Sequence, residues 1–240
     1  MKITFVGSSH GVPEANRKCQ SIMMTAKGNT YFFDMGTSAV DALRKRGVSI
    51  DSVKGVFISH MHGDHTNGLI QFIDLITWYF KTPDPVVCLP DLEAARVIDD
   101  WLKVTMNGHK KEIKYKKTKS GCVFDDGVLR VSAISTQHCP NSYAYLLECG
   151  GKRVLITGDL KNPNIDFPDV GAQIIDLVIC ESAHFPATEY ENVFQKYSIK
   201  KVVFTHYSDR FLASVLTSIK CMNDKGIQAL RATDDLELEV

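Results

Sequence analysis

The sequence lacks several features that would assign it to a special class of protein. Its seven cysteines are an odd number and no two of them form a Cys-x-x-Cys pair, which argues against a disulfide framework and a thiolate zinc motif. No hydrophobic run approaches the length that crosses a bilayer. The 28 basic residues balance the 28 acidic ones, so bulk charge draws the chain neither to nucleic acid nor to an anionic membrane.

The first residues also lack the apolar core of a signal peptide, because "MKITFVGSSHG" turns polar after a few apolar positions. Scattered reduced cysteines and the missing export signal together predict a soluble, cytoplasmic protein with no membrane partner. The chain has no low-complexity tract and no Pro/Gly/Ser-rich linker. Since 240 residues are enough to bury a full core, we expect one domain over residues 1–240.

Short β-branched and aromatic runs alternate with segments of helical period. The expected strands are "KITFV", "SIMMTA", "TYFFD", "GVFIS", "PVVCL", "VLRVSAI", "YAYLLE", "RVLIT", "LVIC" and "KVVFT". Apolar positions three or four apart predict helices over 69–80, 91–106 and 208–222. Because tight turns such as "KGN" and "CGGK" join neighbouring strands, we expect mixed sheets that are covered by helices.

The stretch "SHMHGDHTNG" is the most informative motif, since it places His60, His62, Asp64 and His65 within six positions. Residues two apart in extended backbone share a face, so His60 and His62 can bind one ion. Gly63 permits a sharp turn. Asp64 and His65 then lie at the start of a helix that begins near residue 66, where they can point toward a second ion. Imidazole and carboxylate ligands suit zinc, and manganese or iron fit the same set.

Four ligands cannot saturate two ions, so the motif requires further histidines or aspartates at strand ends elsewhere. His138 follows "VLRVSAIST", Asp159 ends "RVLITGD", and His206 ends "KVVFTH". Taken singly, such residues are commonly turn or surface residues. Together with the His-rich stretch they predict a site for two divalent metal ions.

This ordered set of residues resembles the metallo-β-lactamase superfamily over most of the chain. "FVGSSHGVPEANRKCQSI" is similar to the start of the tRNA 3′-processing endonucleases (tRNase Z), and "DLVICESAHF" and "VVFTHYSDRF" are similar to their later motifs. The resemblance implies an α/β fold, a four-layer αββα sandwich of two mixed β-sheets. The ligands that it implies are His60, His62 and His138 for the first ion, Asp64, His65 and His206 for the second, and Asp159 as the bridge, with Asp34 fixing the first loop by hydrogen bonds.

The resemblance also implies further residue roles. Asp64 would accept a proton from the attacking water. Glu181 matches a glutamate that orients a histidine in tRNase Z, and His184 is the candidate for that catalytic histidine. His10 in the first loop and Arg210 in "THYSDRF" are candidates for substrate binding. The resemblance to tRNase Z further suggests a homodimer.

The expected charge of the site points to the class of substrate. Two divalent ions outweigh two aspartates and neutral histidines, which favours an anionic small molecule or an RNA phosphodiester as the substrate. We therefore expect a dinuclear-metal hydrolase that uses a metal-bridging hydroxide on a nucleotide or RNA-type phosphodiester. A carboxylic ester, thioester or lactone hydrolase is the alternative, and a non-catalytic metal-binding protein is the third. Flavodiiron proteins carry glutamate where this chain has His62, so the histidine favours hydrolysis over redox chemistry.

Two segments bear on a nucleic-acid substrate. The interval between His138 and Asp159 is too short for the Gly/Pro-rich arm with which tRNase Z clamps tRNA. The lysine-rich stretch "HKKEIKYKKTK" at 109–119 has two interpretations. It is either an edge strand that its lysines protect from pairing, which we favour, or a cationic strand that tracks phosphates.

Overall fold

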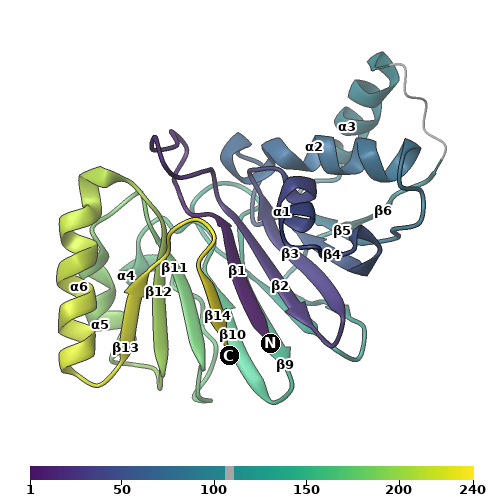
Figure 1. Cartoon of the computed structure of the whole chain (residues 1–240). Helices are drawn as coiled ribbons and strands as arrows, with labels where there is room; N and C mark the ends of the chain where they lie inside the picture. Colours follow the sequence, from purple (N-terminus) through teal and green to yellow (C-terminus); the bar gives the residue numbers. More distant parts are fainter. Residues whose placement is uncertain (106–110) are drawn as a thin grey trace.

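Two stacked β-sheets form the centre of the molecule (Figure 1). The computed structural model describes residues 1–105 and 111–240 of the chain. The first sheet contains, in spatial order, β14 (Glu237–Glu239), β1 (Lys2–Gly7), β2 (Ser21–Ala26), β3 (Asn29–Met35), β4 (Val53–Phe57), β5 (Val86–Leu89) and β6 (Lys114–Lys117). The second contains β13 (Gln228–Arg231), β12 (Lys201–Tyr207), β11 (Leu177–Ser182), β10 (Lys152–Ile156), β9 (Tyr143–Cys149), β8 (Arg130–Ser135) and β7 (Gly121–Asp125). Both sheets mix parallel and antiparallel pairs, as the sequence predicted.

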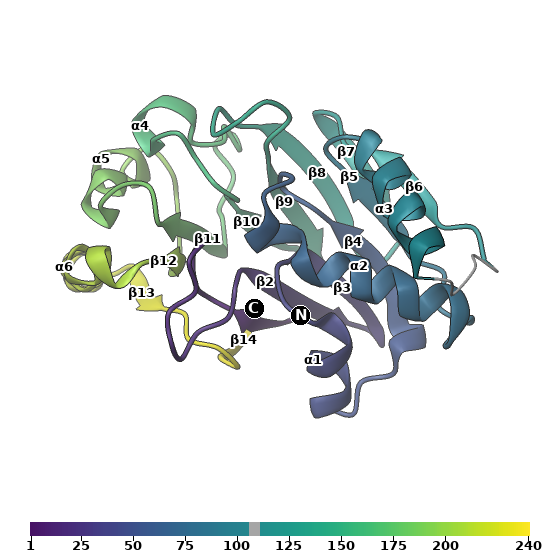
Figure 2. The ribbon, with the colours of Figure 1, turned by 90° about the horizontal axis from the view of Figure 1, so that it is seen from above.

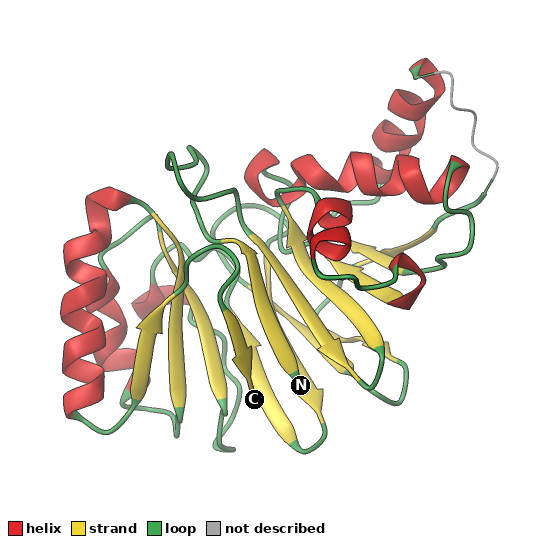
Figure 3. Cartoon of the chain, in the orientation of Figure 1, coloured by secondary structure: helices red, strands yellow, loops and turns green. Residues whose placement is uncertain are grey.

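Helices cover the outer face of each sheet (Figures 2 and 3). They are α1 (Ala39–Lys45), α2 (Gly63–Trp78) and α3 (Glu93–Val104) on the first sheet, and α4 (Pro163–Asp166), α5 (Glu191–Phe194) and α6 (Leu212–Asp224) on the second. Short 3-10 turns span Ile50–Ser52, Ala187–Tyr190 and Asp209–Phe211. Within the described ranges, no helix combines the length and the apolar character that crossing a membrane requires.

The core is divided into three apolar layers, which is the arrangement of an αββα sandwich. One layer lies between the sheets and joins side chains such as Phe33 and Phe57 of the first sheet to Tyr145 of the second. The other two lie between each sheet and its helices. A strand that is buried on both faces needs apolar side chains at successive positions, which explains the unbroken runs "YFF" and "LVIC". The predicted fold class is confirmed.

Two hairpin turns were predicted, and both have the backbone that their glycines favour. Lys27 and Gly28 take φ values of 48° and 81° between β2 and β3, and Gly150 and Gly151 take 58° and 76° between β9 and β10. Two consecutive residues with positive φ make a turn whose twist matches that of the strands it joins. Each of the ten predicted runs overlaps a strand in the structure.

The predicted helices are present, with shifted ends. The helix expected to begin near residue 66 begins at Gly63, so Asp64 and His65 lie inside its first turn. A carboxylate is favourable there because the amide groups of a helix N-terminus carry partial positive charge. β6 lies at the edge of its sheet, as the first interpretation of the lysine-rich stretch expects, while His109 and Lys110 lie outside the described residues.

Candidate metal centre

The seven predicted ligands converge where the two sheets present the carboxyl ends of their strands at one edge. His60 follows β4 of the first sheet, and α2 supplies Asp64 and His65. His138 and Asp159 follow β8 and β10 of the second sheet, where β12 carries His206. The ligand atoms form overlapping groups in which all atoms lie within 4.8 Å of one another. Segments up to 146 positions apart, from His60 to His206, therefore meet at one site.

Three imidazoles form the first group. Nε2 of His60 lies 2.9 Å from Nδ1 of His62, and Nε2 of His138 lies 3.2 Å from the same Nδ1. Nitrogens about 2.05 Å from a zinc ion in tetrahedral geometry are separated by roughly 3.3 Å. The three nitrogens thus have nearly the spacing of ligands around one ion.

A second group surrounds the carboxylate of Asp159. Its Oδ2 lies 3.3 Å from Nε2 of His206, 3.4 Å from Nε2 of His65, 3.7 Å from Nε2 of His60 and 3.7 Å from Nε2 of His138. Oδ2 of Asp64 lies 3.4 Å from Nε2 of His65 and 3.6 Å from Nε2 of His206. Asp159 therefore contacts histidines of both groups, which is the position that a bridging ligand needs.

Two buried atoms of this cluster have no hydrogen-bond partner among the described residues: Nε2 of His65 and Oδ1 of Asp159. Burying a polar atom without a partner is costly, so such atoms in folded proteins commonly indicate a bound ion or water. Both belong to residue types that bind divalent metals. The donor set and its unpaired atoms therefore fit a pair of divalent cations, although metal binding itself stays a prediction.

Asp34 fixes the loop that carries the first histidines. Its Oδ1 accepts a hydrogen bond from the Ser59 amide at 2.7 Å, and its Oδ2 accepts one from the Ser59 hydroxyl at 2.9 Å and one from Nδ1 of His65 at 2.7 Å. Because Nδ1 of His65 donates, its Nε2 is left with the lone pair that a metal requires. The contacts agree with the role expected for Asp34. Sequence reasoning missed Ser59, whose place directly before His60 is the available signal.

The backbone at the start of α2 lies very close to the backbone of the loop after β3. A Cβ atom on Gly36 would lie 1.7 Å from the carbonyl oxygen of Asp64. No side chain fits there unless the backbone moves. Gly36 thus allows the helix to bring Asp64 and His65 into the cluster.

The protonation of the cluster is governed by burial and by neighbouring charges. Burial lowers the pKa of His60 to about 2, so its imidazole is neutral. Burial would also lower the pKa of His65, but Asp159 and Asp34 outweigh that effect and raise it well above its usual value. The two aspartates thus favour the charged form of His65, whereas burial keeps His60 neutral.

Glu181 and His184 form a pair at the edge of the cluster. The buried Glu181 carboxylate contacts Nδ1 of His184 at 2.8 and 3.0 Å and accepts a hydrogen bond from the Leu160 amide at 2.7 Å. Nδ1 of His184 also lies 3.9 Å from Oδ2 of Asp159. Burial alone would lower the pKa of His184, but its hydrogen bond to Glu181 raises it to about 9. His184 is therefore an oriented histidine with a raised pKa beside the predicted metal ligands, and its catalytic role stays a prediction.

The two candidates for substrate binding lie outside the cluster. Nε2 of His10 contacts Oε1 of Glu14 within the same loop at 3.2 Å. Arg210 is exposed, and its guanidinium lies 5.2 Å from the centre of the Phe211 ring. Neither contact tests substrate binding, which remains a prediction for both residues.

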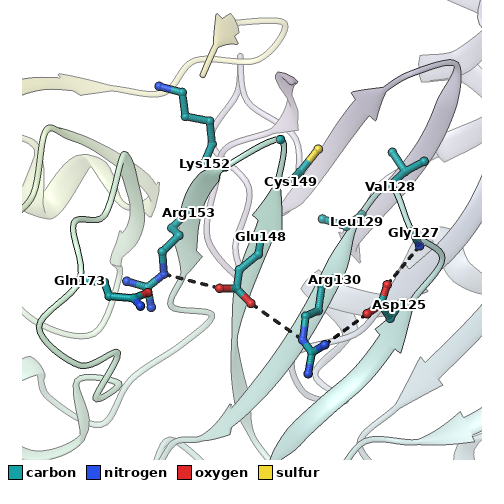
Figure 4. A pocket seen from close by; sticks show the side chains of 12 residues that line it. Asp125, Gly127, Val128, Leu129, Arg130, Glu148, Cys149, Lys152, Arg153 and Gln173 are labelled. Carbon is teal, nitrogen blue, oxygen red and sulfur yellow. Dashed lines mark hydrogen bonds and ion pairs between the residues drawn. The ribbon is translucent and has the colours of Figure 1, made fainter.

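A separate hollow of about 440 Å³ lies at the other end of the second sheet (Figure 4). It borders the β9–β10 turn, whereas His138 and Asp159 follow the opposite ends of their strands. Glu148 on β9 lies between Arg130 on β8 and Arg153 on β10, with ion pairs of 3.9 and 3.8 Å. Arg130 also pairs with Asp125 at 3.3 Å, so both arginines have carboxylate partners. No predicted site residue lines the hollow.

Comparison with known families decides where the chain belongs. The profile of the family described as "Anti-Pycsar protein Apyc1" matches residues 1–221. The chain belongs to this Apyc1 family. Sequence reasoning named the metallo-β-lactamase superfamily and its tRNase Z branch, and did not name the Apyc1 family.

Curated relatives of this Apyc1 family member confirm the resemblance to tRNase Z. Ribonuclease Z of Picrophilus torridus is 28% identical over 172 residues, which cover 70% of this chain and 53% of the relative. Ribonuclease Z of Listeria innocua is 24% identical over 148 residues, which cover 60% of this chain and 48% of the relative. The chain thus matches about half the length of these curated relatives.

Solved structures confirm the fold. Human tRNase Z, short form, superimposes with a TM-score of 0.75 at 17% identity and covers 100% of this chain and 99% of that one. The metallo-beta-lactamase fold protein YhfI from Bacillus subtilis has a TM-score of 0.77 at 18% identity, with 99% of each chain covered. A diphosphatase from the PhnP family has a TM-score of 0.72 at 16% identity, covering 100% of this chain and 97% of that one. This Apyc1 family member has the metallo-β-lactamase fold.

Proposed function

We propose that the protein is a metal-dependent phosphodiesterase that holds two divalent ions, with zinc as the expected metal. The observation that carries the proposal is the position of Asp159, whose Oδ2 lies 3.3–3.7 Å from nitrogens of four histidines. The first ion would be held by His60, His62 and His138, the second by Asp64, His65 and His206, and both by Asp159. The names Ribonuclease Z and diphosphatase among the similar proteins support phosphoester chemistry.

Divalent ions held by these residues would supply a hydroxide nucleophile at neutral pH, by lowering the pKa of bound water, and would offset the charge of a phosphodiester. The protein supplies the remaining parts of the reaction. Asp64 is ionised, because contact with His65 lowers its pKa despite its burial, and it can accept the proton that the attacking water loses. Asp34 keeps the ring of His65 oriented through the 2.7 Å contact to Nδ1.

His184 is the proposed acid for the leaving group. When the new bond to phosphorus forms and the ester P–O bond breaks, the leaving oxygen needs a proton. Glu181 contacts Nδ1 of His184 at 2.8 Å, so the ring is held by one nitrogen and can give a proton from the other, Nε2. The buried carboxylate of Glu181 stabilises the charged ring before the transfer.

A nucleotide or a short RNA-type phosphodiester is the proposed substrate. Between His138 and Asp159 the chain forms only the β9–β10 hairpin, which supports a compact ligand over a clamped tRNA. We also propose that residues 1–240 act as one cytoplasmic domain, and that two copies form a homodimer as the resemblance suggests.

Metal analysis and a substrate panel test the proposal together. The protein is freed of metal, reloaded with zinc or manganese, and assayed on bis-p-nitrophenyl phosphate, cyclic and linear nucleotides, unprocessed tRNA and a panel of lactones and thioesters. We expect two ions per chain and hydrolysis of the phosphodiesters. Preferred hydrolysis of lactones or thioesters would replace the phosphodiesterase assignment, and inactivity on every compound with two ions bound would leave a metal-binding protein.

A further inference from the structure

His206, the residue assigned to the second ion, has an unusual backbone. Its φ is 47°, in the left-handed region that residues with a side chain rarely occupy. Such a conformation persists only when neighbouring contacts hold it in place. His206 therefore depends on the segments that pack against the end of β12.

The segment 8–20 between β1 and β2, called here the first loop, packs against this end of β12 (Figure 1). Nδ1 of His206 lies 2.9 Å from the carbonyl oxygen of Ser9 in that loop. A carbonyl oxygen only accepts, so Nδ1 donates to it and Nε2 faces Asp64 and Asp159, on the side where the ion would bind. The position of Ser9 thus sets both the tautomer and the orientation of the His206 ring.

Arg17 connects the two backbone segments that make this contact. Its Nη1 donates to the carbonyl oxygen of Tyr207, directly after His206, at 2.9 Å, and to that of Ser8, directly before Ser9, at 3.4 Å. The same guanidinium stacks on the Tyr207 ring, with Cζ 3.9 Å from the ring centre. The side chain of Arg17 is only 10% exposed, so these contacts are largely shielded from water.

A third contact extends the connection beyond the strand. Nη2 of Arg17 donates to Oδ1 of Asp209 at 3.0 Å, and the Asp209 amide donates to Glu14 of the first loop at 2.9 Å. A planar guanidinium can make these bonds and the stacking contact at once, which an ammonium group cannot. Arg17 therefore fixes the residues on both sides of the Ser9–His206 contact.

We propose that Arg17 is a positioning residue for the second metal ion: it holds the His206 ring against Ser9 and so keeps Nε2 directed at Asp64 and Asp159. The inference rests on the proposed ligand set. The first ion has separate support, because Asp34 and Ser59 fix His60 and its loop from the other sheet. Loss of Arg17 should consequently affect one ion and spare the other.

A metal titration of the full chain tests this inference without relying on activity. Metal-free wild type, Arg17→Ala and Arg17→Lys are titrated with zinc against a chromophoric chelator. For Arg17→Ala we expect the first zinc ion to bind as tightly as in wild type. The affinity for the second ion should fall by about 10–100-fold, the range for loss of a group that orients a ligand. The affinity of Arg17→Lys for the second ion should lie between those of wild type and Arg17→Ala. Lysine can still reach the Tyr207 carbonyl, but it cannot also stack on the Tyr207 ring and bond to Asp209.

Arg46→Ala is a matched control for a general loss of stability. Arg46 is similarly buried, with a side chain that is 13% exposed, and it joins α1 to the C-terminal segment through Asp235 and Glu237. Its removal should lower the melting temperature and leave both ions bound. The positioning role would be overturned if Arg17→Ala bound both ions equally weakly. It would also be overturned if Arg46→Ala lost as much affinity for the second ion as Arg17→Ala does.

A second measurement does not need any metal. In protein labelled with ¹⁵N at histidine, the Nδ1–H proton of His206 should exchange slowly in wild type and in Arg46→Ala, and quickly in Arg17→Ala or, if that variant does not fold, in Arg17→Lys. Unchanged exchange in the folded Arg17 variant would refute the inference. A wild-type protein that binds fewer than two ions would instead refute the proposed ligand set, so the two failures are distinct.

Discussion

Oδ2 of Asp159 and Nε2 of His206 lie 3.3 Å apart, although 47 positions of sequence separate the two residues (159 to 206). Asp159 follows β10, and His206 lies on β12 of the same sheet, with β11 between these strands. Parallel strands bring their carboxyl ends to one edge, so side chains from separate strands meet there. This contact connects the residue proposed as the bridge to a proposed ligand of the second ion.

Replacing Asp159 by asparagine should remove the bridge. The amide keeps the shape of the side chain but lacks the negative charge that holds a cation, so we expect the protein to retain fewer than two ions. Metal affinity and kcat should each fall by more than about 100-fold, the upper end of the effect of losing an orienting group. Elemental analysis after dialysis and steady-state kinetics measure both. Two ions and normal kcat in Asp159→Asn would contradict the assignment of the bridge.

His184→Ala should lower turnover while both ions stay bound. Loss of a general acid costs about 10²–10⁴-fold in rate, and most for a leaving group that is a poor acid. We therefore expect a large fall in kcat on a nucleotide ester and a smaller fall on bis-p-nitrophenyl phosphate, whose leaving group departs without a proton. Glu181→Gln should show the same pattern more weakly. An equal loss on both substrates, or loss of metal, would exclude the role of acid.

Gly36→Ala should destabilise the start of α2. The added Cβ would lie 1.7 Å from the Asp64 carbonyl oxygen. The two backbone segments therefore have to move apart, which should lower the free energy of unfolding by about 3 kcal/mol. Gly11→Ala is the control, because its Cβ would lie 3.4 Å from the Asp64 carboxylate, close to an ordinary contact. Denaturant unfolding gives both free energies. Equal stability of the two variants would refute the close approach.

Asp176 should make the free energy of unfolding depend on pH in the acid range. Burial alone would raise its pKa, but hydrogen bonds from Lys200, the Arg153 amide and Lys152 lower it to about 2. A carboxyl group with a lowered pKa in the folded state stabilises the fold above its unfolded pKa, and this stability is lost as the pH falls toward the folded value. Because the lysines are partly exposed, we expect Asp176 to contribute only about 1 kcal/mol to the free energy of unfolding.

Unfolding in urea between pH 5 and pH 2 measures this dependence, and Asp176→Asn should have a flatter profile than wild type. Asp100→Asn is the comparison, because the ion pairs of Asp100 on α3 lie on the exposed surface, where water screens them and leaves little pH dependence over this range. Parallel profiles for wild type and Asp176→Asn would show that Asp176 does not set the acid sensitivity.

Much of the fold followed from local patterns in the sequence. The apolar runs of β3 and β11 and the glycines of both hairpin turns are signals that lie within a few residues of one another. The strand β14 had no such signal, because "ELE" is short and polar and pairs only with β1 at the far end of the chain. The start of α2 was also misplaced, since its position depends on the fit of Gly36 beneath Asp64, which is a contact between distant segments.

The candidate site was predictable to a similar extent. The histidines and aspartates could be named because their residue types carry the chemistry, and the structure brings them together. Their orientation could not be predicted. Arg17 donates to two backbone carbonyl oxygens and to Asp209, and Ser59 donates to the Asp34 carboxylate. A serine or an arginine in a loop gives no sign in the sequence of the carbonyl or carboxylate that it will contact. The resemblance to a known family named Asp34 and Glu181 as positioning side chains, whereas Ser59 and Arg17 came from the structure alone.

The proposed ligands come from both halves of the sandwich: His60 and Asp64 belong to the first sheet and its helix, and Asp159 and His206 to the second. Cations held between them would tie the two sheets together, because separating the sheets would remove ligands from each ion. Catalytic competence and mechanical cohesion would then be coupled. A chelator would then not only stop turnover but also loosen the edge of the sandwich where these residues meet.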